Sequence, residues 1–144
     1  MPSHRKFVRL AFEKLYPLSN KDVVVDLGSG DGVVLRIAAE KAGSAIGYEL
    51  NPALVFISRI LARNNQKIEI RLGDMWLVDL PEETTLIYAF TVTRDRAKLE
   101  RKLQQSVNQW GHSVSVITYG SPLKNKKPLR VLYAHTLYLF EPEM

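Results

Sequence analysis

The chain has 144 residues with 46% hydrophobic and 24% charged residues and a formal net charge of +5, which predicts one globular domain over 1–144 and excludes a disordered or fibrous class. It has no cysteine and 3 histidines, so disulfides, thiolate zinc sites and cysteine nucleophiles are excluded and no metal site is expected. No apolar run approaches the roughly 20 residues that cross a bilayer, and the N-terminus lacks the apolar core of a signal peptide, so we expect a cytoplasmic protein without a membrane segment.

Short β-branched runs alternate along the chain with stretches of helical periodicity, a pattern typical of an α/β fold. Ser3 is the expected N-cap of the first helix, and Asn51-Pro52 supplies the cap and the first-turn proline of a later one. The apolar run 22–27 is typical of a parallel strand that is buried on both faces. The predicted elements are, in order, a helix at about 3–16, a strand at 22–27, a helix through about 41, a strand at 44–48, a helix at 51–64, strands at 67–72 and 84–90, a helix at 94–108 and a strand at 113–119.

The C-terminal segment 128–140 holds two more apolar runs without room for a helix between them. It predicts a hairpin of antiparallel strands, with a weakly indicated turn at Ala134-His135. Seven strands result, and we expect a Rossmann-like, doubly wound and mostly parallel sheet with an antiparallel C-terminal strand. In this minimal domain, 22–80 would be the cofactor-binding half and 84–144 the substrate-side half.

A glycine-rich turn follows the first predicted strand. Asp26 lies near the end of that strand, and residues 28–32 read Gly-Ser-Gly-Asp-Gly. Such a turn into a helix binds nucleotide-like cofactors at the carboxyl edge of a parallel sheet, although the dinucleotide spacing would need a glycine at Val33. The observed spacing favours a cofactor with an amino acid end, because Asp26 can meet its ammonium group while the glycines allow close approach. A simple strand-to-helix turn is the alternative.

Two further acidic residues end strands: Glu49 follows the second strand, and Gly73-Asp74 follows the third. With the glycine turn, they make the chain resemble the class I S-adenosylmethionine-dependent methyltransferases. The resemblance implies S-adenosyl-L-methionine as cofactor, with Glu49 at the ribose hydroxyls and Asp74 at the adenine amino group. The expected cofactor-binding residues are Asp26, Gly28, Ser29, Gly30, Glu49, Leu50, Asp74 and Met75. The alternatives are that Glu49 only offsets a helix dipole and that Asp74 only completes a turn.

Three strings narrow the resemblance: Pro2-Ser3 ahead of the first helix, 47–52 (GYELNP) and 135–139 (HTLYL). With the glycine turn, they look like the small protein-lysine methyltransferases of archaea and their relatives in the FAM173 group. The likeness covers nearly the whole chain and is most specific in the first half. It implies methyl transfer to a lysine side chain of a protein, without the membrane anchor that some members carry.

Methyl transfer is an in-line displacement that needs alignment and no nucleophilic side chain. A lysine acceptor with a pKa near 10.4 must lose its proton, which costs about 4.6 kcal/mol at pH 7, and an apolar or aromatic channel beside a sulfonium lowers that cost. The fourth strand ends in Phe90, Thr91 and Thr93, which are the candidates for the channel, and Phe7 is a candidate lid residue. The catalytic residues are otherwise unassigned.

The nature of the acceptor leaves alternatives open. No Asp/Asn-Pro-Pro-aromatic motif follows the fourth strand, which argues against methylation of a base nitrogen. The loop at 121–127 and the short connection at 75–83 leave the cofactor edge sparsely covered, which favours a macromolecule and most of all a protein. Basic clusters at 4–6 and 124–127 keep an RNA methyltransferase as the alternative, and a non-catalytic cofactor-binding module is another. Nothing in the sequence indicates the oligomeric state.

Overall fold

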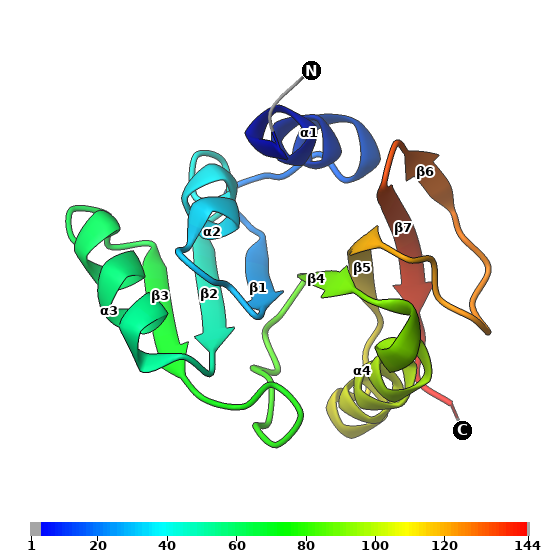
Figure 1. The fold of residues 1–144 in the computed structure, drawn as a ribbon. Helices are drawn as coiled ribbons and strands as arrows, with labels where there is room; N and C mark the ends of the chain where they lie inside the picture. The colour runs from blue at the N-terminus through cyan, green and yellow to red at the C-terminus, as the bar shows by residue number, and fades with distance from the viewer. Residues whose placement is uncertain (1–3, 144) are drawn as a thin grey trace.

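A mixed sheet of 7 strands forms the centre of the molecule (Figure 1). The structure is a computed structural model and describes residues 4–143. The strands are β1 (Val23–Leu27), β2 (Ser44–Glu49), β3 (Ile68–Leu72), β4 (Leu86–Thr91), β5 (Val114–Gly120), β6 (Arg130–Leu132) and β7 (His135–Phe140). Their order is β3-β2-β1-β4-β5-β7-β6, and only β7 pairs antiparallel with its neighbours. The predicted fold class is confirmed.

Helices cover both faces of this sheet (Figure 1). One core lies beneath α1 (His4–Leu10), its π-helical continuation η1 (Ala11–Leu15), α2 (Val33–Ala38) and α3 (Pro52–Leu61). The other lies beneath α4 (Arg96–Trp110), which follows the 3-10 turn η2 (Thr93–Asp95). Alternate strand residues enter different cores, so Tyr88 faces α1 and α2 whereas Ile87 faces α4. Within residues 4–143, no helix has the length and apolarity needed to cross a membrane.

Most predicted elements are present with shifted ends. The helix α2 ends at Ala38 rather than near Lys41, and α3 ends at Leu61 rather than near Asn64. Beyond Ala38 the chain continues in tighter turns, with a bond from the Lys41 amide to the Ala38 carbonyl. Charged helix α4 lies 2 residues later than the predicted range at both ends, because the 3-10 turn precedes it.

The first helix changes its hydrogen-bonding register along its length. The predicted range 3–16 is helical from His4 to Leu15, but from Ala11 onward the turn widens and the Tyr16 amide donates to the Ala11 carbonyl at 3.0 Å. Apolar periodicity alone does not distinguish such a wide turn from an α-helix. The predicted N-cap Ser3, together with Pro2, lies outside the described residues.

The C-terminal hairpin turns one residue earlier than predicted. Tyr133 and Ala134 form the turn, and His135 is already the first residue of β7. Tyr133 has a φ of 54°, in the left-handed region that glycine or asparagine usually occupies. The ring of Phe7 packs against it at 4.8 Å between centroids. The prediction at Ala134-His135 was wrong because a tyrosine carries no turn signal and is held here by a contact distant in sequence.

Candidate functional site

The glycine turn between β1 and α2 is held against the end of β2. The amides of Gly28 and Ser29 both donate to the Tyr48 carbonyl, at 2.9 and 3.0 Å. Gly28 and Gly30 have φ values of 78° and 58°, which glycine adopts without strain. A Cβ on either glycine would have no neighbouring atom within 4 Å. The space in front of the turn is therefore open to a ligand.

A third glycine, Gly47 on β2, lets the turn approach the sheet. A Cβ at Gly47 would lie 2.5 Å from Leu35 Cδ1 and 2.6 Å from Ser29 Oγ. No larger residue fits without moving the turn. From the sequence, this glycine belonged only to the string on which the family resemblance depends, because a glycine within a strand does not reveal what packs against it.

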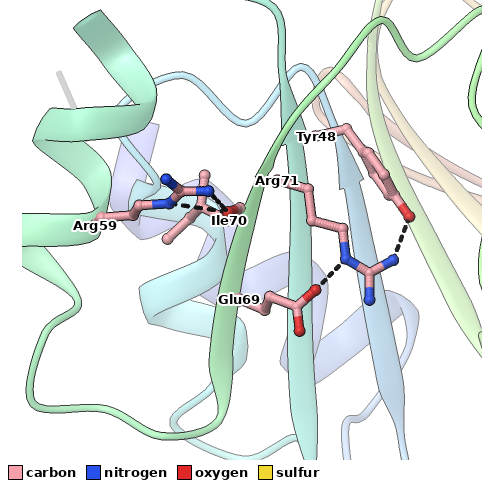
Figure 2. A network of polar contacts seen from close by, with 5 residues as sticks. All are labelled: Tyr48, Arg59, Glu69, Ile70 and Arg71. Carbon is pink, nitrogen blue, oxygen red and sulfur yellow. Dashed lines mark hydrogen bonds and ion pairs between the residues drawn. The ribbon is translucent and has the colours of Figure 1, made fainter. Parts of the chain in front are cut away.

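Two arginines hold the neighbouring edge of the sheet (Figure 2). Arg59 of α3 donates from Nε and Nη2 to the Ile70 carbonyl of β3, at 3.1 and 2.8 Å. Arg71 pairs with Glu69 and donates from Nη1 to the Tyr48 hydroxyl at 2.8 Å. Tyr48 is thus held at both its side chain and its carbonyl, and this fixes the end of β2 beside the glycine turn.

Asp26 is a buried carboxylate near the end of β1. Its relative exposure is 3%, and among the described residues no hydrogen bond or ion pair reaches its carboxylate oxygens. Burial, with a smaller effect from the Glu49 carboxylate, raises the pKa of Asp26 to about 8. A buried carboxyl group without a partner is costly, so the site fits a ligand that brings a cationic donor.

Two pockets flank Gly28. The inner pocket, of about 260 Å³, has Asp26, Gly28 and Gly30 on one side and Tyr88, Phe90 and Tyr119 on the other. The outer pocket, of about 180 Å³, is lined by residues that include Gly28, Tyr48, Glu49, Leu50, Asp74 and Met75. All the sequence-predicted cofactor residues line one of the two pockets, with Ser29 in the inner one. Because Gly28 borders both, an elongated ligand can occupy the two pockets together.

The two acidic residues of the outer pocket also have local partners. Glu49 accepts hydrogen bonds from the Gly30 amide at 2.8 Å and from the Asn51 amide at 2.9 Å. Asp74 accepts from the Trp76 amide at 2.9 Å. Both side chains therefore stabilise the turns around the pocket, as the alternative interpretations of the sequence expected, while also lining the space in which a ligand would lie.

The three residues considered for the acceptor channel lie in different environments. Phe90 is 61% exposed, lines the inner pocket and has its ring 5.8 Å from that of Tyr119. Thr91 is buried, and its Oγ1 has no hydrogen-bond partner in the part of the chain that the structure describes. Thr93 Oγ1 bonds Ser121 Oγ at 2.8 Å. Of the three, only Phe90 lines a pocket around the glycine turn. The candidate lid residue Phe7 does not line either pocket.

Sequence reasoning missed a polar pair in the wall of the inner pocket. Tyr88 Oη lies 2.8 Å from Nε2 of His135, and both side chains are buried. Burial raises the pKa of Tyr88 above its usual range and lowers the pKa of His135 to about 4. The tyrosine stands in register beside Asp26, across β1 and β4. A phenol within an otherwise apolar strand was the available signal, but its partner lies 47 residues away.

Comparison with known proteins identifies relatives of the chain. Residues 26–130 match the family described as the ANTKMT methyltransferase domain. The chain is 34% identical over 113 residues to an ATP synthase lysine N-methyltransferase of Xenopus laevis, a match that covers 76% of this chain and 48% of that protein. It is 26% identical over 151 residues to a protein-lysine N-methyltransferase of Saccharolobus islandicus, covering 97% of this chain and 91% of that protein. The chain thus spans about half the length of the Xenopus relative.

A solved structure resembles the whole chain. It is an RNA methyltransferase from Salinibacter ruber in complex with S-adenosyl-L-homocysteine, with a TM-score of 0.84 and 27% sequence identity. The alignment covers 100% of this chain and 95% of that one. The fold described above, including the antiparallel strand β7, is therefore that of a small methyltransferase.

Proposed function

Because the chain belongs to the family of the ANTKMT methyltransferase domain, we propose that it transfers a methyl group from S-adenosylmethionine to the amine of a lysine side chain in a protein. S-adenosylmethionine supplies that methyl group on a sulfonium sulfur. The observation that carries the proposal is the buried, unpartnered Asp26 carboxylate beside a glycine turn that has a pocket on each side.

The residues around the turn fit the chemistry of this cofactor. Asp26 would pair with the ammonium group of its amino acid end, and the open space before Gly28 and Gly30 would accept its backbone approach. In the outer pocket, Glu49 would accept hydrogen bonds from the ribose hydroxyls and Asp74 from the adenine amino group. Leu50 and Met75 would supply apolar contacts beside them.

The reaction requires the chain to align two groups rather than to supply a nucleophile. The acceptor amine has to be neutral when it attacks, and an ordinary lysine is protonated at pH 7. The aromatic wall of the inner pocket, formed by Tyr88, Phe90 and Tyr119, disfavours the charged ammonium by removing water from it. This environment supports transfer to an amine without a strong base.

A protein is the acceptor that the relatives support, since two of them are named as lysine N-methyltransferases. The sparsely covered edge of the sheet supports a large acceptor. Methylation of RNA is the second candidate, favoured by the name of the Salinibacter structure and by the net charge of +5.

Labelling in a lysate tests the proposal. The protein is incubated with methyl-labelled S-adenosylmethionine and a cell lysate, and the products are treated with protease or nuclease. We expect protease to release the label, nuclease to leave it, and hydrolysis to yield methylated lysine. The D26N variant should lose transfer, whereas D79N, an exposed aspartate outside both pockets, should keep it. Label that nuclease removes and protease leaves would contradict a lysine acceptor.

A further inference from the structure

The far wall of the inner pocket is a continuous row of rings across three strands. Phe90 on β4, Tyr119 on β5 and His135 on β7 are register partners. The Tyr119 and His135 ring centroids are 4.8 Å apart, and those of Tyr88 and His135 are 5.6 Å apart. The row lies on the α1 and α2 face of the sheet, where Asp26 also lies. A molecule in the inner pocket therefore meets Asp26 on one side and this row on the other.

Packing alone does not explain the Tyr88–His135 pair. The Nδ1 atom of His135 is buried and has no partner among residues 4–143, so the pair carries a desolvation cost that a phenylalanine and a leucine would avoid. The pair also places a phenol oxygen on the pocket side of an otherwise aromatic and apolar wall. A costly polar pair facing a pocket indicates a role toward the molecule bound there.

Both members of the pair are neutral near pH 7. The pKa of His135 is lowered to about 4 by burial and by His4, and that of Tyr88 is raised by burial and by the Asp26 carboxylate. When the Tyr88 hydroxyl donates its proton to Nε2 of His135, the remaining lone-pair capacity of the phenol oxygen faces the pocket. The oxygen then acts as an acceptor of fixed direction.

We propose that Tyr88, oriented by His135, accepts a hydrogen bond from the acceptor amine and aims its lone pair at the donor methyl, while Phe90 and Tyr119 contact the amine's alkyl stem. The inference rests on the proposed function and narrows its acceptor to a primary amine on an unbranched stem. The ammonium first releases a proton to bulk water. The amine lone pair then forms the new N–C bond as the S–C bond breaks, and that electron pair stays on sulfur. The product leaves as a methylated ammonium.

The register of the sheet supports this assignment. Tyr88 is the neighbour of Asp26 across β1 and β4, so a group held by Tyr88 lies beside a donor whose ammonium Asp26 holds. Tyr88 would thus be a catalytic residue that touches the reacting nitrogen, and His135 a positioning residue that acts through it. Phe90, at 61% exposure, leaves the entrance open to a side chain presented by a large substrate.

Two analogues of the donor test the proposal without a known substrate. In both, the sulfur of S-adenosylhomocysteine is replaced by a nitrogen that carries either an aminopropyl arm or a butyl arm of equal length. Titration calorimetry measures both affinities and that of S-adenosylhomocysteine itself. We expect the wild-type protein to prefer the amine arm by about tenfold, as a hydrogen bond to a charged group provides. In Y88F the preference should fall to about twofold or less, with the affinity for S-adenosylhomocysteine unchanged.

Further variants separate a positioning role from a structural one. H135Q retains an amide donor toward the phenol oxygen and should keep most of the preference, whereas H135L should lose it at unchanged S-adenosylhomocysteine affinity. The matched control is Y138F. Tyr138 is also fully buried and its hydroxyl accepts from the Leu123 amide at 2.8 Å, but it lies in the core beneath α4. This variant should unfold at a lower temperature and keep the amine preference.

The outcomes are distinguishable. A wild-type preference that persists in Y88F, or equal wild-type affinities for the two arms, would overturn the inference while leaving the donor site intact. A loss of S-adenosylhomocysteine affinity in Y88F that matches its loss of amine affinity would place Tyr88 in the donor site and also overturn it. If the folded wild-type protein does not bind S-adenosylhomocysteine, the proposed function itself fails, and the inference fails with it.

Discussion

Asp26 is a single residue whose environment makes ligand binding depend on pH. Its raised pKa, about 8, means that the free protein holds a proton on this carboxyl group near neutral pH. A ligand ammonium binds the carboxylate and not the acid, so binding must release that proton. Residues with this combination of burial and missing partners are typical of ligand sites.

We predict that affinity for S-adenosylhomocysteine rises from about pH 6 to about pH 8, by up to roughly tenfold per pH unit, and declines above that as the ligand's own α-amino group, with a pKa of about 8, loses its proton. Calorimetry in two buffers of different ionisation enthalpy measures the proton released. The D26N variant should bind weakly, with no such pH dependence. Equal binding heats in both buffers would contradict the assignment of Asp26.

At the residue scale, the donor side of the site was more predictable than the acceptor side. Asp26, Glu49 and Asp74 follow or end consecutive parallel strands, so their chain positions alone bring them to one edge. Tyr88 and His135 meet only because β4, β5 and β7 are neighbours in a particular register. A single sequence contains no direct signal for that register, and Phe90 was found only because it ends a strand.

At the scale of elements, the start of α3 supports the outer pocket. Asn51 caps the helix by accepting from the Ala53 amide at 2.9 Å and the Leu54 amide at 3.4 Å, while its own amide donates to Glu49. The cap therefore fixes both the helix and the carboxylate that faces the pocket. This is a link between helix stability and the proposed ribose contact.

We predict that N51A lowers the free energy of unfolding by about 1 kcal/mol, the usual cost of losing an N-cap, and weakens S-adenosylhomocysteine binding less than a change at Glu49 does. Urea denaturation measures the first effect and calorimetry the second. N64A, an exposed asparagine beyond the end of α3, is the control and should change neither. Unchanged stability in N51A would show that the cap contributes nothing.

The order and type of the elements followed from their patterns, whereas their ends did not. The N-cap and proline at Asn51-Pro52 predicted the start of α3 correctly. The π-helical stretch from Ala11 and the turn at Tyr133 were missed, because each depends on packing rather than on a local signal. Such tertiary effects override local propensity most often at helix ends and turns.

For the whole molecule, the proposed halves of the chain divide the site between donor and acceptor. The residues proposed for the donor lie within 22–80, and the aromatic wall comes from 84–144. One core joins the two, since Val24, Tyr88 and Leu137 pack in the same cluster. A single domain over 1–144 remains our proposal, and its two halves would place donor and acceptor on either side of β1 and β4.

The basic loop at 124–127 is tied to the molecule rather than extended from it. Asn125 donates to both oxygens of Glu100, at 2.8 and 3.0 Å. The Lys126 ammonium lies 4.5 Å from the centre of the Phe140 ring and 3.2 Å from Gln104 Oε1. At least this lysine therefore has a packing role, which reduces the weight of the charge as an argument for RNA.

We predict that methyl transfer to lysate proteins falls by less than about threefold between 50 and 200 mM salt, because a protein acceptor requires few phosphate-like contacts. An RNA acceptor held by 6–10 phosphates would lose roughly 10³-fold or more in affinity over the same range. Label incorporation at several salt concentrations measures this, with folding checked by circular dichroism at each. A steep decline would favour the RNA alternative.

The central claim is that the methyl donor binds across the two pockets around Gly28. A crystal structure with S-adenosylhomocysteine tests it most directly. We expect the ligand's ammonium group within hydrogen-bonding distance of Asp26, its ribose hydroxyls at Glu49, its adenine at Asp74, and its sulfur facing the wall formed by Tyr88, Phe90 and Tyr119. A ligand bound elsewhere, or one whose ammonium group does not reach Asp26, would contradict the account.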